Sequence, residues 1–345
     1  MKKTLVLLTI LIPFFLVSFN KSKEKRQWDK ETSLSEVLFD LGEAQPKHYI
    51  KPTEEQIKKG EQIVKKGWTM TPDGDKGRPV SKHYLCTTCH NIEREDPDLR
   101  VSDPEARLPY VKEKGIPFVQ GSPFWGVVNR ETWYNDDYVE KYGDGKIEKA
   151  HNDLRESIQL CAIECSQGRP MDDWEIEAVL AYYWTLDYKM SDLELTEADW
   201  KKLNTESKSK DNDESLRKWL KTFYLQKSPA TFFDSPPSKV DGYGLIGNPT
   251  TGKDIYEISC LWCHNAEKGV SHYTLDDSRN SFKHLDRMMF KDSHFSLYQI
   301  IAYGTYSIPG HRPYMPHYPE EKMSKQQVED LRSYIKLRSK GGKLE

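Results

Sequence analysis

The sequence lacks the motifs that mark several common enzyme classes. Its 345 residues contain no phosphate-binding loop, no glycine-rich dinucleotide fingerprint and no serine-histidine-acid arrangement. It also lacks a surplus of basic residues, since 51 Lys and Arg are set against 54 Asp and Glu, for a net charge of −3. Residues 1–20 carry Lys2 and Lys3 as their only charges, so the net charge without them is −5. We therefore expect no nucleic-acid partner.

An uninterrupted apolar run of the ~20 residues that span a membrane is also missing. The run at residues 4–19 follows Lys2 and Lys3 and is broken by Pro13. A charged start before an apolar run is typical of an export signal, although no clear small-x-small cleavage site follows. We expect residues 1–20 to be a cleaved signal peptide or a retained N-terminal anchor in the inner membrane. No cysteine stands directly after the run, so a lipid-modified N-terminus is not expected. The rest of the protein should be periplasmic or face the periplasm.

Cysteine is scarce, but four of the six cysteines form two copies of one motif. The pentapeptides CTTCH at 86–90 and CLWCH at 260–264 each place two cysteines two residues apart, with a histidine directly after them. Two such thiols can add to the two vinyl groups of a haem, and the histidine can bind the iron from one face. A zinc site would need a second Cys or His pair at finger spacing, and a thioredoxin-like pair would need strand and helix patterns. Both are absent.

We therefore predict two covalently attached c-type haems. The attachment residues would be Cys86, Cys89, Cys260 and Cys263, and the iron ligands His90 and His264. Attachment of haem through thioethers occurs outside the cytoplasm in bacteria, which agrees with the export signal.

The patterns around the two motifs predict an all-α protein with two cytochrome c-like haem domains, at residues 50–192 and 240–345. A capping box from Thr53 to Gln56 begins a helix that ends near Gly67. Residues 91–126 are rich in proline and charge and predict an extended loop. Residues 193–239 read as a linker, because residues 204–215 are almost wholly polar.

Three sulfur atoms are candidates for the sixth ligand of the first haem. Cys161 and Cys165 lie on the apolar face of a predicted helix that starts at Leu154, and Met171 follows its end at Gly168. Methionine would raise the reduction potential, whereas a thiolate would lower it. The two cysteines could instead remain buried free thiols or form a disulfide, for which the ~6.2 Å between Cα atoms four residues apart on a helix is near the upper limit.

The segment from Phe118 to Leu186 resembles the N-terminal haem domain of di-haem thiosulfate dehydrogenases and related sulfur-oxidation cytochromes. The resemblance rests on residues 155–161, on Gly-Arg-Pro-Met at 168–171 and on the aromatic-rich helix that follows. It implies that Cys161 binds the iron opposite His90 and that sulfur chemistry occurs at this haem, which would make Cys161 the catalytic residue of an enzyme. The chain departs from the family by carrying Cys165 and by an insertion at 131–151, so the substrate stays open.

An enzyme of this kind also needs cations to hold an anionic substrate. Arg155 and Arg169 are candidates. Each is equally a candidate for a propionate partner or a surface charge.

Residues 240–345 resemble mono-haem class I cytochromes c. The resemblance rests on a helix that runs from Gly252 into the second motif, on Tyr-Met-Pro at 314–316 and on a final helix after a capping box at Ser324. It implies that the first and last helices cross and that Met315 binds the iron opposite His264. The competing histidines, expected at the surface or near the propionates, are His294, His311 and His317.

Two functions follow from these patterns. The first is an electron carrier that passes single electrons from the first haem to the second and on to a redox partner, such as another cytochrome or a membrane oxidase or reductase. The second is a di-haem oxidoreductase of thiosulfate dehydrogenase type, which acts on a small sulfur anion at the first haem. A di-haem peroxidase has a similar size, but the leucine-arginine-asparagine motif of that family is missing between the two motifs.

Overall fold

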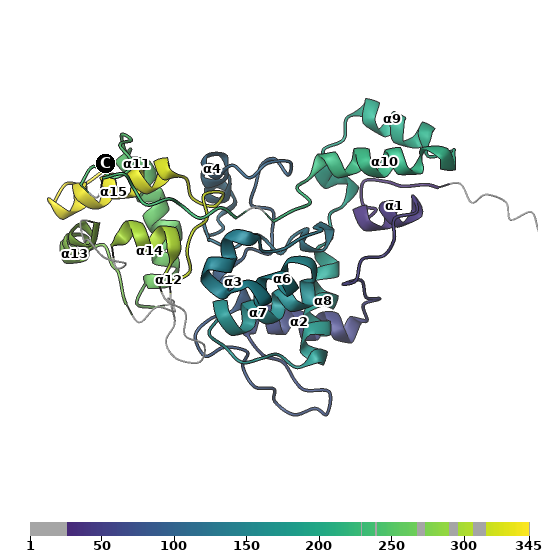
Figure 1. Ribbon diagram of the computed structural model, residues 1–345, viewed down its shortest axis with the longest axis horizontal. Helices are drawn as coiled ribbons and strands as arrows, with labels where there is room; N and C mark the ends of the chain where they lie inside the picture. Colours follow the sequence, from purple (N-terminus) through teal and green to yellow (C-terminus); the bar gives the residue numbers. More distant parts are fainter. Residues whose placement is uncertain are drawn as a thin grey trace, which may run out of the picture.

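The computed structural model describes residues 26–228, 230–238, 240–267, 273–289, 296–305 and 315–344. These residues form helices joined by loops, with isolated β-bridges but no β-strand among them, which confirms the predicted all-α class (Figure 1). None of the helices within the described ranges is long and apolar enough to cross a membrane. The predicted export signal at residues 1–20 lies outside these ranges.

The first helical group is built on the crossing of α2 (Glu54–Lys66) and α8 (Asp173–Tyr183), in the centre of Figure 1. The helix α2 begins at the predicted capping box of Thr53 and Gln56 and ends at Gly67, whose φ of 78° suits glycine. Gly60 makes the crossing close, because a Cβ there would lie 1.9 Å from the carbonyl oxygen of Ala178. Only glycine fits at this contact.

The second helical group repeats this crossing with α11 (Pro249–Ile255) and α15 (Lys325–Ser339). The helix α15 begins at the predicted capping box of Ser324 and Gln327. A Cβ at Gly252 would lie 2.0 Å from the carbonyl oxygen of Asp330, so glycine again permits the contact. The helices α13 (Arg279–Met289) and α14 (Leu297–Tyr303) complete this group, on the left of Figure 1.

Residues 193–239, predicted to be a polar linker, contain two helices. The helices α9 (Glu197–Glu206) and α10 (Asp213–Leu220) pack near α1 (Leu34–Asp40). Leu203, Leu216 and Leu220 are fully buried in the cluster that includes residues of α1. The sequence interpretation missed this packing because the leucines flank the polar run at 204–215 instead of interrupting it.

Residues 91–126, predicted to be an extended loop, contain the helix α4 (Pro104–Lys114), capped by Asp103. Leu108 and Val111 of α4 are buried in the hydrophobic core of the second helical group. The first haem segment therefore supplies part of the second group's core. A buried ion cluster lies at this contact between the two helical groups, the seam, where Lys322 Nζ is 2.5 Å from Glu95 Oε1.

Candidate haem sites

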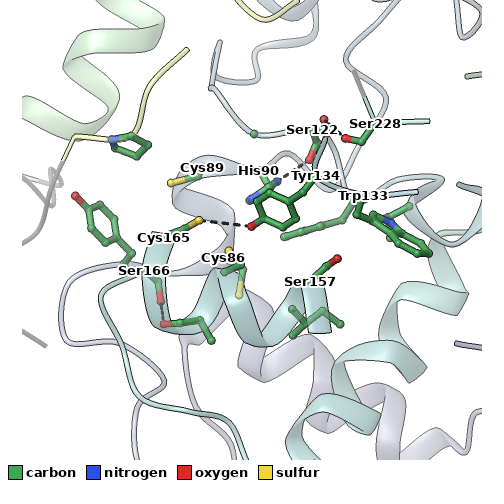
Figure 2. Close-up of a pocket in the computed structure, with 18 of the residues that line it drawn as sticks. Cys86, Cys89, His90, Ser122, Trp133, Tyr134, Ser157, Cys165, Ser166 and Ser228 are labelled. Carbon is green, nitrogen blue, oxygen red and sulfur yellow. Dashed lines mark hydrogen bonds between the residues drawn. The ribbon is translucent and has the colours of Figure 1, made fainter. Parts of the chain in front are cut away.

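A cavity in the first helical group brings together the residues predicted to hold the first haem. Its volume is about 180 Å³, and it is partly open to solvent. Cys86 and Cys89 begin and end α3 (Cys86–Cys89), and His90 follows it. Figure 2 shows these three residues around this space. The three sulfur candidates line the same cavity, namely Cys161, Cys165 and Met171.

His90 is oriented for binding a metal. Its Nδ1 lies 2.6 Å from the carbonyl oxygen of Ser122. A carbonyl oxygen only accepts hydrogen bonds, so Nδ1 carries the proton and Nε2 keeps its lone pair for iron. The ring stacks on Phe124 with 4.5 Å between centroids. Gly121 also lies against the ring, since a Cβ there would be 2.5 Å from two of its atoms.

The thiols of Cys161 and Cys165 lie on a π-helical turn, η3 (Cys161–Cys165), where a single α-helix was predicted. Turns of this kind are frequent at functional sites. The hydroxyls of Tyr134 and Tyr142 lie 3.5 and 3.4 Å from the sulfur of Cys165. A hydrogen bond with Cys165, together with burial, raises the pKa of Cys161 well above its usual value.

None of the six cysteines forms a disulfide, so the disulfide alternative for Cys161 and Cys165 is wrong in this structure. Met171 is fixed through its backbone, because its N–H donates to Gln159 Oε1 at 2.8 Å and its carbonyl accepts from Gln159 Nε2 at 3.0 Å. The structure places all three sulfur candidates at the cavity and leaves the choice of ligand open.

The end of the cavity away from the cysteines carries polar groups that the sequence did not reveal. Trp133 is 6% exposed, and its indole Nε1 is buried without a hydrogen-bond partner. Figure 2 shows Trp133 on the opposite side of the cavity from Cys89, and Arg130 also lines the cavity. A buried unpaired donor calls for an acceptor, and a haem attached at the cysteines would direct its propionates to this end. The residues present therefore fit a haem.

The two arginines proposed from the sequence are occupied elsewhere. Arg155 lies 2.5 Å from Glu177, and Arg169 lies 2.7 Å from Glu175. Neither lines the cavity. Their pairing favours a structural role, and Arg130 is the arginine that faces the site.

The second motif repeats the histidine geometry of the first. His264 follows the π-helical turn η8 (Tyr256–Cys260) and lies within α12 (Leu261–His264), and its Nδ1 is 2.6 Å from the carbonyl oxygen of Tyr273. Its Nε2 is thereby left for a metal. Cys260 and Met315 both pack against the core of this group.

The histidines that competed with Met315 do not all fall near the second motif. His317 lines the first cavity, whereas His294, His311 and Tyr314 lie outside the described residues. Met315 is held by Thr305, whose Oγ1 accepts its N–H at 2.8 Å.

The two motifs touch each other. The indole Nε1 of Trp262, inside the second motif, donates to the carbonyl oxygen of Thr88 in the first motif at 3.0 Å. Burial raises the pKa of Cys89, and the neighbouring thiol of Cys263 raises it further. The attachment cysteines of the two motifs are therefore neighbours, although they are separated by more than 170 positions in the chain.

Comparison with known families bears on the second motif. Residues 247–335 match the family model for cytochrome c oxidase, cbb3-type, subunit III. The match supports a c-type cytochrome domain in the C-terminal part of the chain. Such a domain implies covalently bound haem c, electron transfer and redox partner proteins. No curated protein and no solved structure matches the chain.

Proposed function

We propose that the protein is an exported di-haem c-type cytochrome that transfers single electrons through two covalently bound haems. The observation that carries this proposal is the contact between the two attachment motifs, made by the hydrogen bond from Trp262 to Thr88. Attachment at neighbouring cysteines would bring two haems close together at a fixed seam. Electrons would then pass between them without a diffusing carrier.

The repeated construction of the two halves supports a haem in each. Gly60 and Gly252 permit the same close helix crossing, and His90 and His264 each donate from Nδ1 to a backbone carbonyl. The matched family covers only the second half, so the first haem rests on this repetition and on the fit of the first cavity.

Each part of the chain has a defined task in this proposal. Haem supplies reversible one-electron chemistry when bound, and the protein sets potential, access and orientation. In the second domain His264 and Met315 would hold the iron, and methionine ligation would suit a relatively high potential. A thiolate of Cys161 at the first iron would lower its potential, so electrons would run from the first domain to the second. Trp262 and Tyr273, beside the second motif, are 44% and 45% exposed, which supports an accessible exit to a partner cytochrome or a membrane oxidase or reductase.

Haem counting tests the proposal directly. We expect two covalent haems per chain by pyridine haemochrome assay and by intact mass spectrometry. A Cys86→Ala/Cys89→Ala variant and a Cys260→Ala/Cys263→Ala variant should each keep one, and their potentiometric titrations should show one wave each where the parent shows two. A single haem in the parent protein would overturn the proposal.

A second candidate function is the oxidation of a small sulfur anion at the first haem. The observation that favours it is the presence of two thiols, Cys161 and Cys165, at the cavity beyond those needed for attachment. Under this alternative, thiosulfate should reduce the oxidised protein, and Cys161→Ser should abolish that reduction while both haems stay attached.

A further inference from the structure

His317 belongs to the C-terminal segment but lines the first cavity, together with the neighbouring Pro316. Its side chain is 5% exposed, and its Nε2 is buried without a hydrogen-bond partner. The ring is fixed by aromatic neighbours, with centroid distances of 4.3 Å to Phe232 and 5.3 Å to Tyr138. A rigid, buried and unpaired nitrogen at a cavity wall needs a partner that the described protein atoms do not provide.

Lys141 determines which nitrogen of His317 carries the proton. The Lys141 ammonium lies 3.3 Å from Nδ1 of His317 and 2.7 Å from the carbonyl oxygen of Tyr303. An ammonium group can only donate, so Nδ1 accepts and the ring proton of the neutral imidazole is on Nε2. The unpaired group that His317 presents is therefore an N–H donor. This tautomer has no lone pair at Nε2 for iron, so His317 suits ligand recognition better than metal binding.

The charges around this donor favour an anion. Lys141 places a positive charge directly behind the imidazole, and none of the described residues that line the cavity is acidic. Aromatic rings enclose this side of the cavity, because Tyr138 neighbours His317 and Tyr134 lies 4.8 Å from Tyr138 between ring centroids. A donor beside a cation binds anions more strongly than neutral acceptors.

A haem propionate does not account for this donor. The hydroxyl of Tyr134 contacts the sulfur of Cys165, and Figure 2 shows Cys165 beside Cys89, so the chain of contacts from His317 leads to the cysteine end of the cavity. The propionates of a haem attached at Cys86 and Cys89 would lie at the other end, by Trp133. Trp133 and His317, the unpaired donors among the described residues of the cavity, thus serve different acceptors.

We propose that the cysteine end of the first cavity binds a small inorganic oxyanion through the Nε2–H of His317, with Lys141 supplying the balancing charge and the thiol of Cys165 close by. Lys141 belongs to the insertion at 131–151, and His317 comes from the other domain. Within the segment that resembles sulfur-oxidation cytochromes, Lys141 and Cys165 are thus departures from that family, and His317 lies outside the segment. The site goes beyond electron transfer and does not depend on the number of haems.

Calorimetric titration of the haem-loaded, oxidised protein with sodium sulfate and with sodium thiosulfate, at constant ionic strength, tests the site. Sulfate has the same charge as thiosulfate but cannot reduce a haem, so its binding is measured apart from any turnover. His317→Phe removes the donor and keeps an aromatic ring, and Lys141→Met removes the charge and keeps the apolar stem. Lys112→Met is the matched control, because it loses the same charge from a surface pair with Asp254.

We expect at least one of the two anions to bind, with a Kd raised about tenfold or more by each cavity variant and less than about twofold by the control. His317→Gln, which keeps a side-chain N–H donor, should recover part of the affinity. Circular dichroism and the haem spectrum establish that each variant is folded. If Lys141→Met does not fold, the two His317 variants alone test the site. Absence of binding to the parent protein, or equal affinity of parent and His317→Phe, would overturn the proposal.

Discussion

Replacing Gly121 by alanine should displace His90 and destabilise the first haem site. The added Cβ would lie 2.5 Å from both Cε1 and Nδ1 of His90 and 2.6 Å from the carbonyl oxygen of Cys89. Carbon contacts are comfortable at ~3.5–4.0 Å, so the ring or the loop must move by about 1 Å. The carbonyl of Cys89 cannot yield easily, because it accepts the Gly121 N–H at 2.8 Å. The imidazole is therefore the group that moves.

The cost of Gly121→Ala has two parts. Overpacking costs about 1–3 kcal/mol, and weakening the hydrogen bond from His90 Nδ1 to Ser122, now 2.6 Å, costs about 1 kcal/mol more. We expect the free energy of unfolding to fall by about 2–4 kcal/mol and the electron paramagnetic resonance signal of the first haem to change. Urea unfolding of the haem-loaded protein measures the first effect.

Gly145→Ala is the matched control, because Gly145 lies in α6 (Asp144–Asn152) and a Cβ there meets nothing within 4 Å. The free energy of unfolding of this control should rise by about 0.5–1 kcal/mol. If Gly121→Ala unfolds within about 0.5 kcal/mol of the parent protein and keeps its spectrum, the assignment of this close contact is refuted.

Three further predictions concern other parts of the molecule. Cys161→Ser should remove a thiolate-type low-spin signal from the resonance spectrum, whereas Cys165→Ser should keep it; an unchanged Cys161→Ser spectrum would exclude this ligand. Gly252→Ala should lower the free energy of unfolding by about 2 kcal/mol, because its Cβ would meet the Asp330 carbonyl oxygen at 2.0 Å; a neutral effect in urea unfolding would contradict the crossing. Burial raises the pKa of Asp187 to about 6, above its unfolded value of ~3.9. The folded state therefore binds the proton more tightly than the unfolded state, and this stabilisation is lost as the pH rises through 6. We expect the free energy of unfolding to fall by about 1–2 kcal/mol, a size that allows for the partial exposure of the side chain. Asp187→Asn should remove that loss between pH 4.5 and 7.5, and an unchanged pH profile would contradict the shift.

The sequence predicted those features that depend on neighbouring residues. Both capping boxes start helices where Thr53 and Ser324 predicted them, because a cap needs only a side chain and a backbone amide three residues apart. The crossing of α11 and α15 was available only through resemblance to a family. Its physical basis, the missing side chain at Gly252, is visible only when the second helix is in place.

The features that the sequence did not predict depend on residues far apart in the chain. Arg155 and Arg169 were candidates both for anion ligands and for structural or surface charges, and only the structure shows their carboxylate partners, Glu177 and Glu175. His317 was one of three histidines that competed with Met315 for the second iron, and it was expected at the surface or near the propionates. Its true neighbour, Lys141, is 176 positions away, and no local pattern indicates that contact.

The buried ion cluster at the seam argues that the two halves do not separate during the proposed electron transfer. Glu95 and Arg107 are fully buried and Lys322 is 3% exposed. Burial alone would raise the pKa of Glu95, but Lys322 and Arg107 hold it below its usual value, so the carboxylate stays charged. Parting the halves would leave this charge without Lys322, and a buried charge that loses its partner costs about 3–5 kcal/mol.

The apolar residues at the seam lead to the same conclusion. Leu108 and Val111 of α4 would leave the core of the second group if the halves separated. A flexible linker would allow each haem domain to find its partner by diffusion. The packing of α4, the ion cluster and the hydrogen bond from Trp262 to Thr88 instead hold the two attachment motifs at one distance. The rate of transfer between the proposed haems should then be set by this fixed geometry and by the difference in potential, and solvent viscosity should leave it unchanged.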